Sequence, residues 1–578
     1  MTATAAPQSP AATATSLPAL LLRHTAERPQ DAAIREKHRG VWRELTWERY
    51  AERARNAGLG LLELGVDAGD KIAVQSENRP EWLLADIGAQ GVGAVVTGIY
   101  PTSPAAEVEY LLDHSESVVV VVEDEEQLDK VLAVRDRLSA LRHVVLVDPR
   151  NVKGLDDPKV LTWEQLEELG ARRDAREWDE RVERLQAGDT AIIVYTSGTT
   201  GPPKGALISH ANLLAAADVF LQVYDVGPED EVLSYLPLSH IAERLFSVVN
   251  ALAAGYVVNF GEGGESFTQD LRDVQPTFFL GVPRVWEKMM ASVEIRMGDA
   301  SRLKRAVHGR RLLKGPLREK LGLSRCRNAV SGAAPIAPQV LEYFRALGVP
   351  IREGYGQTEN TAICTYTPAD DVRIGTVGKA APGVELRIAD DGEILTRSAG
   401  VFQGYFKNTE ATAETVDPDG WLHTGDVGEL DEDGFLRITD RKKDIIITAG
   451  GKNISPSEIE NRLKVSPYVR EAVVIGDRRK YLVALIGIEA DTVGDWATRN
   501  GVPYTTYGDL AAKDEVRDLV AAWVEEVNQD FAQVETIKRF ALIAKELDHE
   551  DGELTATQKV KRRAIEQQFA DEIEALYR

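Results

Sequence analysis

The sequence predicts an α/β protein whose larger part contains doubly wound parallel sheets. Between about residue 71 and residue 356, short runs of β-branched residues alternate with longer amphipathic stretches. The short runs are apolar throughout, which is typical of strands that helices cover on both faces of a sheet. The expected strands are residues 71–74, 117–122, 144–147, 191–195, 256–260 and 276–281.

The pattern changes after residue 356 and predicts a small antiparallel β unit. Turns rich in Gly and Asp separate its expected strands, which is typical of hairpins. We therefore expect a β-rich subdomain at about residues 360–440. Its strands are residues 384–388, 393–396 and 435–439.

A charged segment begins at Asp440, and we place a domain boundary there. The region beyond it is mixed, with an expected strand pair at residues 472–475 and 482–488 and a long helix near residues 514–534. The expected domains are a large N-terminal domain, residues 19–440, and a small C-terminal domain, residues 441–578.

Residues 1–18 are rich in Ala, Thr, Ser and Pro and contain no Lys or Arg. We expect them to form a disordered tail. A secretory signal needs a basic start and an apolar run of about 7–15 residues, and a membrane span needs about 18 apolar residues. The sequence has neither pattern, so we expect a cytoplasmic protein.

Composition excludes several classes of function. The 578 residues are 43% hydrophobic and 28% charged, which is typical of a globular chain with several compact units. The 68 Lys and Arg against 92 Asp and Glu give a net charge of −24. This charge repels phosphate backbones, so we expect no nucleic-acid partner. Cys326 and Cys364 are too few for a disulfide framework or a Cys-based zinc site, which fits a reducing compartment.

The most informative segment follows an expected buried strand and precedes a helical pattern. It is Tyr195-Thr-Ser-Gly-Thr-Thr-Gly-Pro-Pro-Lys204. Its hydroxyls, glycines and lysine can surround phosphate oxygens, because glycine lets backbone N–H groups approach a phosphate closely. The spacing is not that of a Walker loop, and the chain has no GxGxxG helix start or GxSxG elbow. P-loop ATPases, kinases, Rossmann dehydrogenases and α/β-hydrolases therefore lose their main support.

This segment resembles the phosphate loop of the adenylate-forming superfamily, which includes acyl-CoA synthetases, luciferases and the adenylation domains of peptide synthetases. Six further motifs of that family follow in its order, and the region from residue 419 to residue 443 is most similar to the long-chain fatty acyl-CoA synthetase branch. The six motifs are residues 236–240, 331–335, 355–359, 421–426, 440–444 and 554–559.

The resemblance implies a fold and a reaction. The fold is a large adenylation domain that contains a small β-barrel subdomain, followed by a small mobile α+β domain that rotates between two half-reactions. The reaction joins a fatty acid to coenzyme A and uses ATP and Mg²⁺. A carboxylate is a poor electrophile, so it is first converted to a mixed anhydride with AMP. This step requires cations and donors around the phosphoryl oxygens.

The resemblance also implies roles for the residues that handle phosphate and acid. Lys559 stabilises the α-phosphate during adenylation, Thr358 contacts that phosphate, and His240 lies near the carboxylate. Glu359 and Thr199 are the expected Mg²⁺ ligands. The β- and γ-phosphates are expected to bind Thr196, Ser197, Gly198, Thr199, Thr200, Gly201 and Lys204.

Nucleoside, hinge and coenzyme A residues follow from the same resemblance. Asp426 accepts the ribose hydroxyls with Arg441 beside it, and Lys443 is the hinge about which the C-terminal domain rotates. Gly450 and Gly451 let the pantetheine arm pass close to the backbone. The expected nucleotide-flanking residues are Ser331, Gly332, Ala333, Glu353, Gly354, Tyr355 and Gly356.

Several alternatives stay open at this point. The chain is a long-chain fatty acid:CoA ligase, a medium-chain or aryl-CoA ligase, or an acyl-AMP ligase that delivers to a carrier protein. It can also be a catalytically silent binding protein, although Lys204, Glu359, Asp426 and Lys559 are all retained. No serine motif of a carrier protein follows the lysine motif. Acyl chain length and the choice between monomer and homodimer stay open.

One segment departs from the acidic average. Residues 302–325 contain nine Lys or Arg and a single acidic residue, Glu319, with apolar residues at near-helical spacing. The segment is either a solvated helix face or a basic amphipathic surface. A basic surface would attract anionic lipid at the inner face of the membrane, or a coenzyme A phosphate.

Overall fold

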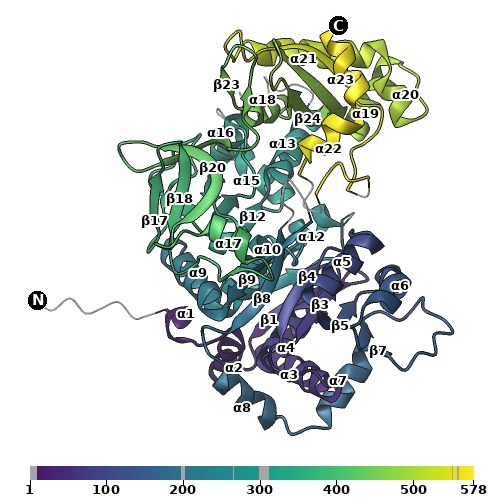
Figure 1. Ribbon diagram of the computed structural model, residues 1–578, viewed down its shortest axis with the longest axis vertical. Coiled ribbons are helices and arrows are strands. Elements are labelled where there is room, and N and C mark those ends of the chain that lie inside the picture. Colours follow the sequence, from purple (N-terminus) through teal and green to yellow (C-terminus); the bar gives the residue numbers. More distant parts are fainter. Residues whose placement is uncertain (1–8, 197–201, 265, 298–310, 550, 556–558) are drawn as a thin grey trace, which may run out of the picture.

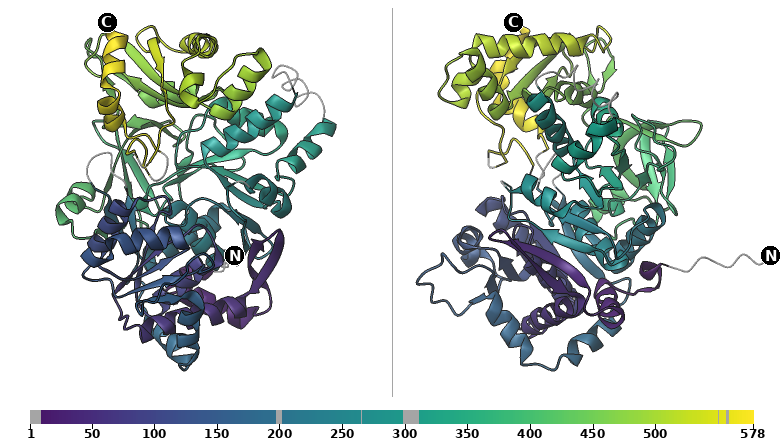
Figure 2. Two further views of the ribbon diagram at one scale, coloured as in Figure 1. Left: turned by 90° about the vertical axis from the view of Figure 1, so that its right-hand side faces the viewer. Right: turned by 180° about the vertical axis from the view of Figure 1, so that it is seen from behind.

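The computed structural model describes residues 9–196, 202–264, 266–297, 311–549, 551–555 and 559–578 (Figure 1). Figure 2 shows from two further sides that a small C-terminal domain stacks on a larger N-terminal domain along the long axis of the molecule. The fold class predicted from the sequence is confirmed, since α/β sheets build the large domain and an α+β unit follows it.

An eight-stranded sheet forms the base of the large domain. Its strand order is β19-β9-β8-β4-β3-β5-β6-β7, and the six strands from β8 to β7 are parallel. The strands are β3 (Lys71–Gln75), β4 (Val95–Ile99), β5 (Ser117–Val122), β6 (His143–Leu146), β7 (Val160–Thr162), β8 (Thr190–Thr196), β9 (Lys204–Ser209) and β19 (Gly404–Tyr405).

Helices cover both faces of this sheet, as the apolar strands predict. Val119 and Val121 share one core with the helices α3 and α4, while Val120 and Val122 share another core with α5 and α6. Alternate residues of one strand therefore face different helix layers. The helices around the sheet are α3 (Trp47–Glu63), α4 (Pro80–Gly91), α5 (Ala105–Ser115), α6 (Glu125–Val134), α7 (Trp163–Ala171) and α8 (Arg176–Arg184).

Two further sheets complete the α/β part of the large domain. One has the order β10-β11-β1-β2, and the other has the order β12-β13-β14-β15-β16. Their strands are β1 (Ala32–His38), β2 (Val41–Thr46), β10 (Glu231–Ser234), β11 (Val257–Phe260), β12 (Phe278–Gly281), β13 (Asn328–Ser331), β14 (Ile351–Tyr355), β15 (Thr365–Tyr366) and β16 (Lys379–Ala380). Their helical segments are α9 (His210–Val223), α10 (Ile241–Arg244), the π-helical turn η2 (Leu245–Val249), α11 (Asn250–Ala254), α12 (Phe267–Val274), α13 (Pro283–Met297), α15 (Arg311–Lys320) and α16 (Pro338–Leu347).

The predicted β-rich subdomain is an antiparallel sheet of order β17-β18-β20-β21. An antiparallel bridge between Lys379 and Phe435 joins it to β16 of the neighbouring sheet. Its elements are β17 (Glu385–Ile388), β18 (Glu393–Arg397), β20 (Leu422–Leu430), β21 (Leu436–Arg441) and the helix α17 (Thr409–Thr415).

The C-terminal domain has a hydrophobic core of its own on each face of a three-stranded sheet. Val474 faces one core and Val473 faces the other. The strands are β24 (Val469–Ile475), β25 (Leu482–Ile488) and β26 (Ile537–Leu542), and a small hairpin pairs β22 (Ile446–Ile447) with β23 (Asn453–Ile454). The helices are α18 (Pro456–Leu463), α19 (Ala490–Asn500), α20 (Tyr507–Ala511), α21 (Asp514–Asn528), α22 (Arg562–Gln568) and α23 (Ala570–Tyr577).

The predicted disordered tail at residues 1–18 is wrong for residues 9–18, while residues 1–8 lie outside the described residues. Helix α1 (Pro10–Thr13) packs against α9, and helix α2 (Leu17–Glu27) begins within the expected tail. Ser9 and Ser16 cap these helices, and Leu17 is only 1% exposed. Burial and capping order a segment whose composition alone is typical of disorder.

None of the described helices is both long enough and apolar enough to cross a bilayer.

Candidate active site

The two described ends of the phosphate loop, Thr196 and Lys204, lie on paired strands of a β-hairpin. Strands β8 and β9 are antiparallel, and Thr196 lies opposite Lys204. Ser197, Gly198, Thr199, Thr200 and Gly201 lie outside the described residues. The ammonium of Lys204 is 4.9 Å from the ring centroid of Tyr405, and the Tyr405 hydroxyl donates to Glu359 Oε1 at 2.6 Å. Tyr405 therefore brings the predicted phosphate lysine and the predicted metal carboxylate together.

Thr358 and Glu359 lie in the short 3₁₀ turn η3 (Thr358–Asn360), which follows β14. Each is 9% exposed. Gly356 comes just before this turn, and a Cβ there would lie 2.3 Å from the carbonyl carbon of Ala362. Close backbone approach therefore requires glycine at this position.

Asp426 joins two strands of the site. Tyr355, the last residue of β14, donates its hydroxyl to Asp426 Oδ2 at 2.6 Å. Arg441 lies opposite Asp426 in the β20–β21 pair, with its Nε 3.4 Å from Oδ1. Burial raises the pKa of Asp426, while the Arg441 charge and the Tyr355 hydrogen bond oppose that shift.

The predicted nucleotide-flanking residues meet at the ends of β13 and β14. Ser331 is paired in register with Glu353, and Gly332 approaches Gly354 closely enough that a Cβ would lie 3.5 Å from the Gly354 oxygen. The buried Ser331 hydroxyl has no hydrogen-bond partner among the described residues. Burial raises the pKa of Glu353 to about 8. Ala333 adopts a left-handed backbone with φ of 68°, so the chain turns sharply directly after this pair.

Lys559 reaches this group from the C-terminal domain. Its backbone is held in a hairpin, because Thr555 N–H donates to the Lys559 oxygen at 2.8 Å and Leu554 bridges to Val560. Lys559 as a residue is exposed, but dense surroundings desolvate its ammonium and lower its pKa to about 8. Arg441 lowers the pKa further, while Asp426 and Glu359 oppose the shift.

His240 is the N-cap residue of α10, and its Nδ1 accepts the Ala242 N–H at 3.2 Å. Burial lowers the pKa of His240 to about 4, with a further contribution from the Lys559 charge. The ring is therefore neutral near pH 7, and the proton lies on Nε2 because Nδ1 accepts. His240 can donate a hydrogen bond to a carboxylate, but it cannot act as a base through Nδ1.

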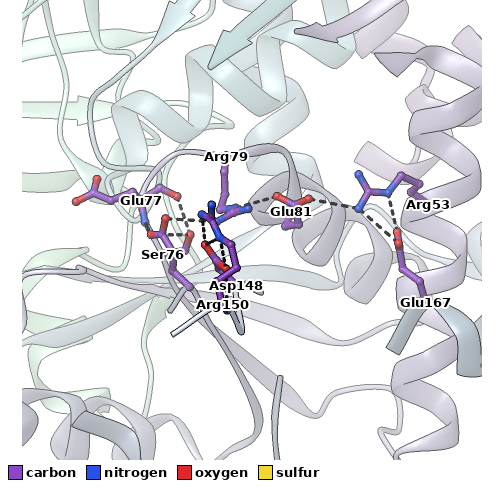
Figure 3. Close-up of polar contacts among 9 residues, drawn as sticks. Arg53, Ser76, Glu77, Arg79, Glu81, Asp148, Arg150 and Glu167 are labelled. Carbon is purple, nitrogen blue, oxygen red and sulfur yellow. Dashed lines mark hydrogen bonds and ion pairs between the residues drawn. The ribbon is translucent and has the colours of Figure 1, made fainter. Parts of the chain in front are cut away.

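A polar network that sequence reasoning missed supports the segment before His240. Asn78 donates to the Leu236 oxygen at 2.7 Å and accepts from Leu238 N–H at 3.2 Å. A chain of ion pairs begins at Arg79, the residue that follows Asn78 (Figure 3). The Arg79 guanidinium pairs with the carboxylates of Glu81 at 2.8 Å and Glu123 at 3.4 Å. The Arg53 guanidinium pairs with the carboxylates of Glu81 at 3.3 Å and Glu167 at 2.8 Å.

The predicted hinge and coenzyme A residues are not brought to this group. Lys443 is exposed in the turn after β21, while its neighbour Lys442 pairs with Asp391 at 2.6 Å. Gly450 and Gly451 lie at the exposed tip of the β22–β23 hairpin, where Gly451 has a φ of 76°. A Cβ on Gly450 would meet only the Thr448 hydroxyl, at 3.9 Å, and a Cβ on Gly451 would meet no described atom within 4 Å.

Comparisons with known proteins identify the family. Residues 21–406 match the family of AMP-binding enzymes, and residues 443–578 match the AMP-binding enzyme C-terminal domain. The chain belongs to the AMP-binding enzyme family. It is 36% identical to the long-chain-fatty-acid–CoA ligase FadD15 of Mycobacterium bovis, over 97% of this chain and 96% of that protein. It is 31% identical to the long-chain-fatty-acid–CoA ligase ACSBG1 of Bos taurus, over 94% and 83% of the two chains.

Solved structures show the same fold. The crystal structure of the anthranilate CoA ligase AuaEII in complex with anthranoyl-AMP superposes with a TM-score of 0.77 at 22% identity and covers all of both chains. At that identity the likeness concerns the fold alone.

The donor set of this AMP-binding enzyme fits a magnesium ion that is shared with a nucleotide. The described residues contain no group of three His, Cys, Asp or Glu side chains that could hold a metal alone. Mg²⁺ usually takes one or two carboxylates and completes its shell with phosphate oxygens and water. Glu359, anchored by Tyr405, offers one such carboxylate.

Proposed function

We propose that this AMP-binding enzyme is an ATP-dependent, AMP-forming long-chain fatty acid:CoA ligase. One observation carries the proposal: the Lys559 ammonium of the C-terminal domain lies within electrostatic reach of Glu359 and Asp426 of the large domain. A cation between a metal-binding carboxylate and a ribose-binding carboxylate suits the α-phosphate of ATP. The names of the relatives that align over nearly the whole chain support a fatty acid as the substrate.

In the first half-reaction, a carboxylate oxygen of the fatty acid attacks the α-phosphorus of ATP. The bond to the β-phosphate oxygen breaks, and pyrophosphate leaves. Lys559 and Thr358 stabilise the α-phosphoryl oxygens, and Lys204 with the loop at residues 196–204 holds the β- and γ-phosphates. Neutral His240 orients the carboxylate through its Nε2 proton. Glu359 and Thr199 would hold a Mg²⁺ ion, which would supply positive charge against the phosphate oxygens.

Nucleoside binding completes the site. Asp426 accepts the ribose hydroxyls, since Tyr355 occupies only Oδ2 and Arg441 lies beside Oδ1. The segments 331–333 and 353–356 flank the adenine. The free Ser331 hydroxyl and the uncharged Glu353 are available to its ring nitrogens and its exocyclic amine.

In the second half-reaction, the sulfur of coenzyme A attacks the acyl carbonyl and AMP leaves. Lys559 occupies the space beside the acyl phosphate during adenylation, so we propose that the C-terminal domain rotates about Lys443 before the thiol enters. The exposed Gly450–Gly451 turn would then border the pantetheine passage. Its exposure here suits a surface that is used only after rotation.

We also propose that the protein works in the cytoplasm and contacts the inner face of the membrane through its basic segment. Residues 302–310 of that segment lie outside the described residues, while α15 carries Lys314, Arg318 and Lys320. Co-sedimentation tests this proposal, with one set of vesicles that contains anionic lipid and another set of neutral phosphatidylcholine alone. Equal binding to both would contradict it.

The test of the enzyme function uses purified protein with Mg-ATP and acids from acetate to oleate, with and without coenzyme A. Acyl-CoA with a long-chain optimum is the expected product. Acyl-AMP that accumulates without thioester would favour delivery to a carrier protein, and an optimum at medium-chain or aryl acids would change the substrate class. No ATP consumption with any acid would contradict the enzyme assignment.

A pair of variants tests the role of Lys559. Lys559→Ala should lose acyl-AMP formation but retain thioester formation from supplied acyl-AMP and coenzyme A. Lys538→Ala, on the exposed edge of β26, is the matched control and should retain both activities. Equal loss of both half-reactions in Lys559→Ala would contradict the assignment.

A further inference from the structure

A histidine of the C-terminal domain contacts a glutamate of the large domain. His549 Nε2 lies 3.0 Å from Glu107 Oε2, and His549 Nδ1 lies 3.1 Å from the Leu554 oxygen. The His549 side chain is 7% exposed and that of Glu107 is 22% exposed. A carboxylate and a carbonyl can only accept hydrogen bonds, so both ring nitrogens must donate. His549 is therefore a cation in this arrangement, and the contact is a shielded interdomain ion pair.

The contact lies at the base of the hairpin that carries Lys559. Leu554, whose oxygen accepts from His549, bridges to Val560, and the next residue, Thr555, bonds to Lys559 through the backbone. On the other side, Glu107 lies in the first turn of α5, which follows β4. Strand β4 packs close to His240, because a Cβ on its Gly98 would lie 2.6 Å from the Cα of Ser239. This ion pair therefore connects the hairpin of Lys559 to the part of the large domain that lies beside His240.

We propose that Glu107 and His549 are positioning residues, which hold the Lys559 hairpin against the large domain while the acyl-adenylate forms. The inference rests on the proposed function, because it assigns these residues to the first half-reaction. Coenzyme A enters after the C-terminal domain has moved, so breaking the contact should slow adenylation and spare thioester formation. A second interdomain pair, Arg284 with Glu489, does not involve the residues of the hairpin.

The contact also makes domain docking depend on pH. The Glu107 hydrogen bond raises the pKa of His549 above its ordinary 6.5, while burial and the Lys561 charge oppose that shift. Among the charged groups on the same segment, Lys545 pairs with both Asp551 and Glu553, and Glu546 pairs with Arg470. Asp548 directly precedes His549 in the chain. Because the pKa is higher in the docked state, the stabilisation is fully present below about pH 6.5. It is lost as the pH rises through the docked pKa.

The experiment compares Glu107→Gln and His549→Gln with the matched control Glu109→Gln. Glu109 lies on the same helix but pairs within the large domain, with Arg137. Single-turnover acyl-AMP formation should fall roughly tenfold in the first two variants, since hydrogen bonds to charged groups are the strong ones. Thioester formation from supplied acyl-AMP should stay within about twofold of wild type, and the control should retain both rates.

The pH profile separates a positioning role from a merely structural one. In Glu107→Gln the alkaline limb of adenylation that belongs to His549 should move to lower pH, because the carboxylate that raises its pKa is gone. An equal fall of both half-reactions, or an unshifted limb with unchanged rates, would overturn the proposal. A folding defect is excluded if Glu107→Gln has the same thermal unfolding temperature as Glu109→Gln. If Glu107→Gln unfolds at a lower temperature, His549→Gln serves as the second variant.

A measurement without substrate separates this inference from the proposed function. X-ray scattering of the full chain at pH 6.5 should show a larger radius of gyration for Glu107→Gln than for Glu109→Gln. If wild type makes no acyl-AMP but this difference is present, the proposed function fails and the interdomain contact stands. If wild type makes acyl-AMP and neither the scattering nor the half-reactions distinguish the two variants, the contact has no positioning role.

Discussion

Lys559 should impose an alkaline limit on acyl-adenylate formation. Its pKa is lowered to about 8, first by desolvation and then by Arg441, against the attraction of Asp426 and Glu359. The cationic form is the one that stabilises a phosphoryl group, so activity should be present below the pKa and decline above it. The pH dependence of kcat/KM reports the free enzyme, in which no nucleotide charge adds to the balance.

The size of the effect follows from this pKa. With a value of about 8, roughly nine-tenths of the enzyme carries the Lys559 proton at pH 7 and roughly one-tenth carries it at pH 9. Removal of one electrostatic donor to a transition state typically costs about 10²–10³ in rate, so the neutral form contributes little. The kcat/KM of adenylation for ATP should therefore fall roughly tenfold between pH 7 and pH 9.

The assay is pyrophosphate release at saturating fatty acid without coenzyme A. Lys559→Arg is the main control, because a guanidinium keeps its proton throughout this range. In this variant the alkaline fall in kcat/KM that is due to Lys559 should disappear. Arg441→Gln removes a repelling cation, so the limb should move to higher pH, whereas Asp426→Asn should move it to lower pH. His549 has an alkaline limb of its own, so the decisive comparison is made in protein that also carries Glu107→Gln and lacks the carboxylate partner of His549. If the alkaline fall in adenylation persists unchanged when Lys559→Arg is added to that protein, the reasoning is refuted.

Three further predictions test other parts of the molecule. Tyr405→Phe deletes the hydroxyl that donates to Glu359 at 2.6 Å. Because that hydrogen bond orients the carboxylate, the Mg²⁺ concentration for half-maximal adenylation should rise roughly tenfold. An unchanged Mg²⁺ titration would argue against Glu359 as a metal ligand. Lys443→Pro should retain adenylation and lose thioester formation in single turnovers, because proline restricts the turn that we propose as the hinge; normal coenzyme A turnover would contradict that proposal. Arg244→Met leaves the fully buried Asp86 without its ion-pair partner and should lower the free energy of unfolding in urea by about 3–5 kcal/mol, whereas a loss below about 1 kcal/mol would match a surface pair.

The strands could be predicted because their apolar runs are local. The run at residues 117–122 is β5 (Ser117–Val122), and its even burial follows from helices on both faces. Strand β19 could not be predicted, because it has two residues and its partner β9 lies about two hundred residues earlier in the chain. Tyr405 is on β19, so no local pattern reveals the residue that links Lys204 to Glu359.

The candidate site divides in the same way. Motif order brought Asp426, Arg441 and Lys559 into one hypothesis, since each lies in a short segment with a recognisable pattern. The Tyr355–Asp426 hydrogen bond depends on how two sheets meet, and the Glu107–His549 contact joins residues 442 positions apart. Such pairs carry no periodic signal, and neither does the desolvation that sets the pKa of His240 and Lys559.

His240 and Lys559 show why the two domains should respond to ATP. Desolvation lowers the pKa of both side chains, and the Lys559 charge lowers that of His240 further. The site without nucleotide therefore places a lysine of lowered pKa near a neutral histidine. The phosphates of ATP bring negative charge to this position, which raises the pKa of Lys559 and favours its cation. By linkage, a ligand that binds the protonated, docked state more tightly must stabilise that state. Departure of pyrophosphate removes most of that charge, so the hold on Lys559 weakens at the moment when coenzyme A needs access.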